Sequence, residues 1–91
     1  MSDSARTRVV VHGRVQGVFF RDTCRREARA RGVAGWVSNR PDGAVEAVFE
    51  GEPGAVAAMV ALCREGPRGA DVSAVDERSE APEGLTGFEV R

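Results

Sequence analysis

The sequence has 91 residues, enough for one domain and too few for a second hydrophobic core. Its net charge of −1 offers no basic field for nucleic acid and no polybasic segment for a membrane surface. No apolar run is long enough to span a membrane, and residues 1–7 are polar, unlike a signal peptide. We therefore expect a single cytoplasmic domain over residues 1–91 that acts as a monomer, with a flexible N-terminus over residues 1–6.

The first expected elements are a strand, a loop and a helix. Residues 7–12 are β-branched in the middle and predict a central strand with both faces at least partly covered. Residues 13–20 follow as a loop. A helix is expected from Arg21, because apolar positions then recur at helical spacing and Gly32 provides a C-terminal stop.

A hairpin is expected next, over residues 34–50. The turn Arg40-Pro41-Asp42-Gly43 joins a strand over residues 34–39 to a strand over residues 44–50. Apolar and acidic residues alternate in the second of these strands. We therefore expect Glu46 and Glu50 to face away from the core.

The rest of the chain predicts one more helix and two strands. Gly51-Glu52-Pro53 opens the helix and Gly66-Pro67 ends it. Its apolar stripe consists of Val56, Met59, Val60 and Cys63. Strands over residues 71–78 and 88–91 follow. We interpret the late acidic residues as a solvated face; they are Asp76, Glu77, Glu80 and Glu83.

The element order, β-α-β-β-α-β with a short extra C-terminal strand, predicts an α+β fold. Right-handed crossovers give a ferredoxin-like sandwich in which both helices cover one face of an antiparallel sheet. The first two strands then run parallel, with the third between them, so their C-terminal ends lie at the same edge. The loop over residues 13–20 leaves one of these ends and Asn39 lies at the other. We therefore expect the loop and Asn39 to lie at one site.

The loop is a candidate anion site. Gly13 and Gly17 permit the unusual backbone angles of a nest of amide groups, and the nest leads into a helix N-terminus. Arg21 adds a permanent charge whose planar fork can engage two phosphate oxygens. The residues alone also fit a simple strand-to-helix turn with a solvated arginine, since the loop matches neither Walker A nor the dinucleotide GxGxxG pattern. Both interpretations stay open at this stage.

Asn39, His12 and four arginines are further polar candidates for a functional role. The amide of Asn39 can donate to and accept from one water molecule, or it can stabilise the start of the following turn. His12 invites a general-base role, but its strand position favours a partly covered structural residue. We interpret the remaining arginines of the first helix as a solubilising surface; they are Arg25, Arg26, Arg29 and Arg31.

The sequence predicts no metal and no cofactor. No carboxylate pair has metal-ligand spacing, and Cys24 and Cys63 lie outside any CxxC or Cys/His pattern. Each cysteine occupies an apolar helical position. We therefore interpret both as small buried residues rather than as a disulfide.

Two motifs resemble the signatures of the acylphosphatase family. The first is Gly13-Arg14-Val15-Gln16-Gly17-Val18-Phe19-Phe20-Arg21. The second combines Gly35-Trp36-Val37-Ser38-Asn39 with Pro41-Asp42-Gly43 and Val45-Glu46. The similarity covers residues 8–91 and includes length, element order and motif spacing. The chain therefore resembles a small free-standing acylphosphatase.

The resemblance implies hydrolysis of carboxyl-phosphate mixed anhydrides to a carboxylate and inorganic phosphate, with phosphate binding as product or inhibitor. It implies that Arg21 binds the phosphate and that Asn39 positions the attacking water, without a metal. The amides of the loop would complete the phosphate site; they belong to Val15, Gln16, Gly17, Val18, Phe19 and Phe20. Ser38 stands where many family members carry a basic residue, and we expect this departure to affect recognition of the acyl end.

Two other functions stay open. Acylphosphatase-like domains also occur in larger maturation enzymes, so one alternative is a non-catalytic anion-binding module; the presence of both Arg21 and Asn39 favours the enzyme. RNA-recognition domains share the element order, but the first strand here lacks outward aromatic residues that stack on bases. We therefore expect a small-molecule acyl phosphate as the partner, and neither nucleic acid nor a membrane.

Overall fold

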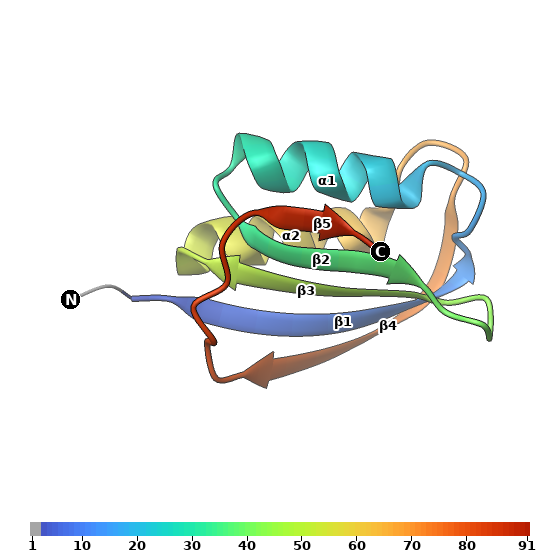
Figure 1. The fold of residues 1–91 in the computed structure, drawn as a ribbon. Helices are drawn as coiled ribbons and strands as arrows, with labels where there is room; N and C mark the ends of the chain where they lie inside the picture. The colour runs from blue at the N-terminus through green and yellow to red at the C-terminus, as the bar shows by residue number, and fades with distance from the viewer. Residues whose placement is uncertain (1–2) are drawn as a thin grey trace.

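The computed structural model describes residues 3–91, which form two helices and five strands (Figure 1). In chain order they are β1 (Ala5–Arg14), α1 (Phe20–Ala30), β2 (Ala34–Asn39), β3 (Val45–Gly51), α2 (Pro53–Glu65), β4 (Asp71–Glu80) and β5 (Phe88–Val90). Each predicted element is present, with boundaries that shift by at most two residues. Neither helix in the described part of the chain is long and apolar enough to cross a membrane.

The strands form one sheet in the order β4-β1-β3-β2-β5, and both helices cover the same face of it (Figure 1). The first four strands pair antiparallel, which confirms the ferredoxin-like arrangement predicted from the sequence. The predicted extra C-terminal strand, β5, pairs parallel to β2, so the five-stranded sheet is mixed. The physical reason is the path of the chain, which crosses from β4 at one edge to β5 at the other and enters alongside β2.

The hydrophobic core lies between the helices and the sheet. The two helices present the apolar stripes that their sequences predict: Phe20, Cys24 and Ala28 from α1, and Val56, Met59, Val60 and Cys63 from α2. The rings of Phe49 in β3 and Phe88 in β5 stack with centroids 5.8 Å apart. This contact anchors the short β5 in the core, although the strand has only three residues.

The start of β1 is held by buried ion pairs. Residues 1–2 lie outside the described residues, but Ala5 and Arg6 belong to β1, so the expected flexible N-terminus is wrong at these two positions. Arg6 is only 5% exposed. Its Nε donates to Glu80 at 2.8 Å and its Nη1 donates to Glu50 at 3.3 Å. These contacts join β1 to the strand on each side of it.

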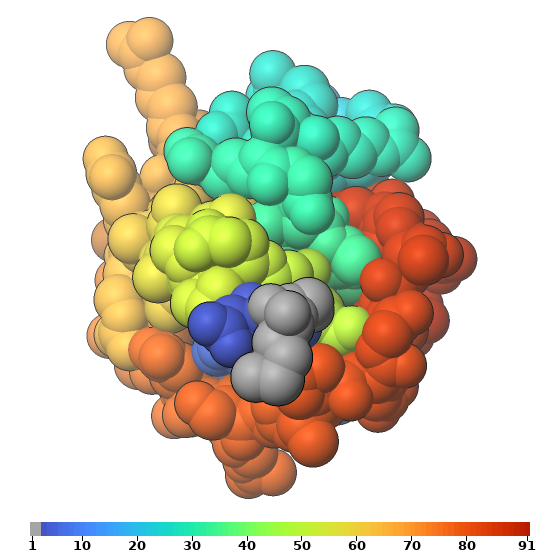
Figure 2. All heavy atoms as spheres, turned by 90° about the vertical axis from the view of Figure 1, so that its left-hand side faces the viewer, coloured from blue at the N-terminus to red at the C-terminus, as the bar shows by residue number. Residues whose placement is uncertain are grey.

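Glu50 lies on the sheet face away from the helices, as its alternation predicts, yet it is buried. The segment after β4 wraps round this end of the molecule (Figure 2, orange to red), and the backbone N–H groups of Glu83, Gly84 and Leu85 donate to the Glu50 carboxylate at 2.7–2.9 Å. Burial alone would raise the pKa of Glu50, but these hydrogen bonds and the one from Arg6 lower it below its ordinary value. The carboxylate therefore stays charged and fixes the loop that leads to β5.

Glu80 is the second acidic residue whose role differs from expectation. Instead of belonging to a solvated face, it accepts hydrogen bonds from Arg8 and Arg6, each at 2.8 Å. These hydrogen bonds lower the pKa of Glu80 to about 2. The outer face of the sheet thus carries a network of ion pairs: Glu80 of β4 stands directly opposite Arg6 of β1, and Arg8, two residues along β1, reaches the same carboxylate diagonally.

Candidate active site

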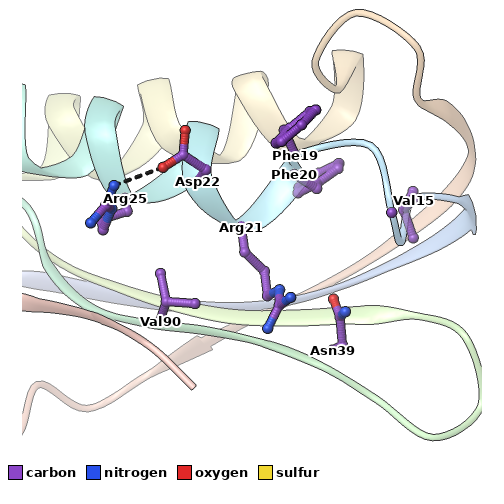
Figure 3. Close-up of a pocket in the computed structure, with 9 residues that line it drawn as sticks. Val15, Phe19, Phe20, Arg21, Asp22, Arg25, Asn39 and Val90 are labelled. Atoms are coloured by element: carbon purple, nitrogen blue, oxygen red, sulfur yellow. Dashed lines mark hydrogen bonds and ion pairs between the residues drawn. The ribbon is translucent and has the colours of Figure 1, made fainter.

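A pocket of about 430 Å³ opens where β1 and β2 both end, at the N-terminus of α1 (Figure 3). Its walls come from the loop after β1, the first turns of α1, and the ends of β2 and β5. The lining residues are Val15, Gly17, Phe19, Phe20, Arg21, Asp22, Arg25, Asn39 and Val90. The crossover geometry therefore brings Arg21 and Asn39, which are 18 positions apart in the sequence, into one pocket.

Two left-handed residues shape the loop that lines this pocket. Gly17 has φ 74° and Phe19 has φ 61°. Left-handed residues at alternate positions turn successive N–H groups toward one point, which is how a backbone nest binds an anion. Phe19 is also the N-cap of α1 and provides no side-chain cap, so no side chain of the N-cap competes for the first N–H groups of the helix.

The conformation of Phe19 is itself informative. It is the one non-glycine residue with positive φ in the described part of the chain, and its side chain is 81% exposed. A left-handed phenylalanine costs about 1–2 kcal/mol relative to right-handed backbone. Such strain is retained where the backbone geometry serves a site, and Phe19 itself lines the pocket.

Gly13 is not among the residues that line the pocket. It lies inside β1, with φ 122°, at a bulge in the pairing of β1 with β4. A Cβ at this position would stand 2.2 Å from the carbonyl oxygen of Asp71. The residue is glycine because the neighbouring strand passes too close for any side chain, so the anion-site role expected for Gly13 is wrong.

Arg21 and Asn39 face one another across the pocket. Arg21 extends from the first turn of α1 down toward the sheet, and the amide of Asn39 rises from the end of β2 toward the guanidinium (Figure 3). The Nη1 of Arg21 donates to the backbone oxygen of Arg91 at 3.4 Å. This long hydrogen bond links the guanidinium to the segment after β5.

Gln16 and Val18, which were expected to bind phosphate through their amides, are not among the pocket-lining residues. The Nε2 of Gln16 donates to the carbonyl oxygens of Arg40 at 2.8 Å and Ala44 at 3.0 Å. It thereby ties the loop to the turn that follows Asn39. Val18 packs against the hydrophobic core. Both side chains hold the loop in place from its outer side.

Three lining residues are not predicted from the sequence: Asp22, Arg25 and Val90. Arg25 was interpreted as part of a solubilising helix surface, but its Nη2 donates to Asp22 at 2.7 Å and it lines the pocket one turn after Arg21. The i, i+4 spacing of Arg21 and Arg25 was the available signal. No sequence signal marked Val90, which reaches the pocket only because β5 pairs with β2.

The other polar candidates lie elsewhere. His12 pairs with Asp76 at 3.0 Å and is not in the pocket. Ser38, expected to bear on the acyl end, is also absent from the lining. Hydrogen bonding with Cys24, together with burial, raises the pKa of Cys63 well above its ordinary value, so this thiol stays protonated. Residues 3–91 contain no cluster of three or more His, Cys, Asp or Glu side chains suited to a metal.

Comparison with known proteins agrees with this geometry. The sequence model of the acylphosphatase family matches residues 7–90. The chain belongs to the acylphosphatase family. The resemblance drawn from the two motifs is therefore confirmed.

Relatives and solved structures of acylphosphatases agree over almost the whole chain. The acylphosphatase of Rubrobacter xylanophilus is 60% identical over 94% of this chain and 79% of its own length. That of Synechococcus is 54% identical over 100% of this chain and 97% of its own. The structure of the Coxiella burnetii acylphosphatase superposes with a TM-score of 0.92 at 37% identity, over 98% of this chain and 94% of that one.

Proposed function

We propose that this chain hydrolyses acyl phosphates by direct in-line attack of water on phosphorus. The observation that carries the proposal is the convergence of three features on one pocket: the left-handed loop at Gly17 and Phe19, the guanidinium of Arg21, and the amide of Asn39. The new bond joins the oxygen of water to phosphorus. The bond between phosphorus and the acyl oxygen breaks, and the carboxylate leaves with the electron pair.

The phosphate group is proposed to lie in the nest formed by the amides of residues 15–20. Arg21 then engages two of its oxygens through the planar fork. The charge on these oxygens is greatest as the bond to the leaving group breaks, so fixed donors stabilise the transition state more than the ground state. Inorganic phosphate, which carries the same oxygens, is expected to bind at this place as product and inhibitor.

Asn39 is proposed to hold the attacking water opposite the leaving carboxylate. A carboxylate leaves without a proton, so the mechanism needs no general acid. Asp22 is the one carboxylate among the described residues that line the pocket, and it is paired with Arg25 and Arg26 at 2.7 and 3.1 Å. We therefore assign the proton of the water to an oxygen of the phosphate group itself, with catalysis resting on position and charge.

The test is release of phosphate from benzoyl phosphate by purified variants. Arg21→Ala is expected to lower kcat/KM by about 10²- to 10³-fold while the protein stays folded. Asn39→Ala is expected to lower kcat by a similar factor and to leave the inhibition constant of phosphate within about threefold of wild type. The matched control is Arg26→Ala, because Arg26 is 65% exposed and lies outside the pocket lining.

The results also decide between catalysis and simple anion binding. A wild-type protein that binds phosphate and releases none from benzoyl phosphate would be a binding module. The same fold forms a small part of full-length HypF, of which this chain covers 12%, at 22% identity. Near-normal turnover by Asn39→Ala would remove the water-positioning role.

We further propose that the chain acts as a monomer in the cytoplasm. Sedimentation of the purified protein tests the oligomeric state.

A further inference from the structure

The pocket continues beyond the proposed phosphate site along the first two turns of α1. Arg25 lines this extension, one helical turn after Arg21, so the two Cα atoms lie about 6 Å apart along the helix axis. The Asp22 carboxylate holds Arg25 in place at 2.7 Å. Two arginines and one aspartate then give this wall a net positive charge.

We propose that Arg25 is a specificity-determining residue that binds a second anionic group, carried on the acyl portion of the substrate. This inference rests on the proposed function, since it adds a subsite to the same pocket. The favoured substrates are acyl phosphates with a carboxylate or phosphate a few carbon atoms away from the mixed anhydride. Acyl phosphates with a neutral acyl group would occupy only the Arg21 end.

The geometry of Arg25 suits this role. Within residues 3–91, the side chain of Arg25 donates one hydrogen bond, from Nη2 to the carboxylate of Asp22. The remaining N–H groups of a guanidinium can bind a further carboxylate or phosphate without breaking that contact. Arg25 is also 40% exposed, so a ligand can reach it, and its charge is only partly screened by water.

Val90 supplies the apolar part of the same subsite. It is 42% exposed, one of two large hydrophobic side chains with high exposure in the described chain. Its side chain points from β5 toward α1, on the opposite wall of the pocket from Arg25 (Figure 3). The carbon skeleton of an acyl group can therefore pack on Val90 while its far anion reaches Arg25.

The alternative is that Arg25 only stabilises the helix through its i, i+3 pair with Asp22. Arg26 separates the two explanations, because it pairs with the same carboxylate at 3.1 Å but lies outside the pocket lining. Arg26→Gln therefore removes an equivalent ion pair and an equivalent charge from the same helix turn. It leaves the proposed subsite intact.

The experiment compares two substrates of the same shape, benzoyl phosphate and 4-carboxybenzoyl phosphate. For each protein, kcat/KM for the carboxylated substrate is divided by kcat/KM for the parent. Arg25→Gln is expected to lower this ratio about fivefold, the effect of one half-exposed ion pair. Arg26→Gln is expected to leave the ratio within twofold of wild type. An unchanged ratio in Arg25→Gln, or an equal fall in both variants, would overturn the proposal.

A binding measurement keeps this result apart from the proposed function. Calorimetry gives dissociation constants for benzoylphosphonate and 4-carboxybenzoylphosphonate. In these analogues a P–C bond replaces the P–O bond that the enzyme would break, so they are not hydrolysed. If wild type hydrolyses neither phosphate but Arg25→Gln still lowers the binding ratio of the phosphonates about fivefold, the proposed function fails and the subsite stands. If turnover is normal and the binding ratio does not change, the subsite fails alone.

Discussion

Replacing Glu50 by glutamine tests how much its carboxylate stabilises the fold by binding Arg6 and the loop between β4 and β5. The Glu50 side chain is 5% exposed and its carboxylate accepts four hydrogen bonds. Oε1 accepts from Arg6 at 3.3 Å and from the amide of Glu83 at 2.9 Å. Oε2 accepts from the amides of Gly84 and Leu85 at 2.7 and 2.8 Å. Glutamine keeps the shape but removes the charge and one acceptor.

The size of the effect follows from this pattern. In Glu50→Gln the one remaining oxygen serves two of the four donors, and the new NH₂ group points its hydrogens at the other two. Each hydrogen bond to a charged group contributes about 1.5–3 kcal/mol, and breaking a buried ion pair costs about 3–5 kcal/mol. We therefore expect the free energy of unfolding to fall by about 3–5 kcal/mol, which lowers Tm by at least about 12 °C in a domain of this size.

Urea unfolding followed by fluorescence is a suitable assay. Trp36 is the single tryptophan and lies on the outer face of the sheet between the guanidinium groups of Arg8 and Arg91, 5.5 and 4.8 Å from its ring. The matched control is Glu89→Gln, which removes the same charge from a side chain that is 70% exposed. We expect that control to change stability by less than about 0.5 kcal/mol. A Glu50→Gln protein within about 1 kcal/mol of wild type would refute the reasoning.

Three further predictions concern single contacts. Gly35→Ala should lower the free energy of unfolding by about 3 kcal/mol or more, since its Cβ would stand 1.8 Å from the carbonyl oxygen of Val48. The control, Gly43→Ala, has open space around its Cβ and should lower it by only about 1–2 kcal/mol; urea unfolding measures both. Gln16→Ala should lower stability by about 2 kcal/mol and also reduce phosphate release, because two hydrogen bonds to the β2–β3 turn are lost; no change in either measurement would contradict this. Glu80 has its pKa lowered to about 2 by the arginines of β1, so its stabilisation is full above about pH 4.5 and is lost as the pH falls toward 2. Unfolding measured from pH 7 to pH 2 should therefore show a smaller decline for Glu80→Gln than for wild type.

Local chemistry made much of the fold predictable. The apolar stripe of α2 and the Pro53 at its start are set by neighbours within a few residues, as is the turn after Asn39. The crossover rule then placed β1 and β2 parallel with β3 between them, and this brought Arg21 and Asn39 to the same edge without any knowledge of side-chain contacts. The sequence thus determined the fold class, the family and the two residues proposed for catalysis, because each depends on local periodicity or on a contiguous motif.

The tertiary structure decided everything that depends on pairs far apart in the chain. The burial of Glu50 requires amides 33 to 35 residues later, and alternation within β3 carries no information about them. The parallel pairing of β5 with β2 brings Val90 to the pocket. Arg25 lines the pocket because β5 then forms the wall opposite the first turns of α1. Gly13 changed from an anion-site glycine to a bulge glycine for the same reason, the close approach of β4. Local sequence specifies which elements form, whereas the environment of a side chain is set by the strands and loops that the fold packs against it.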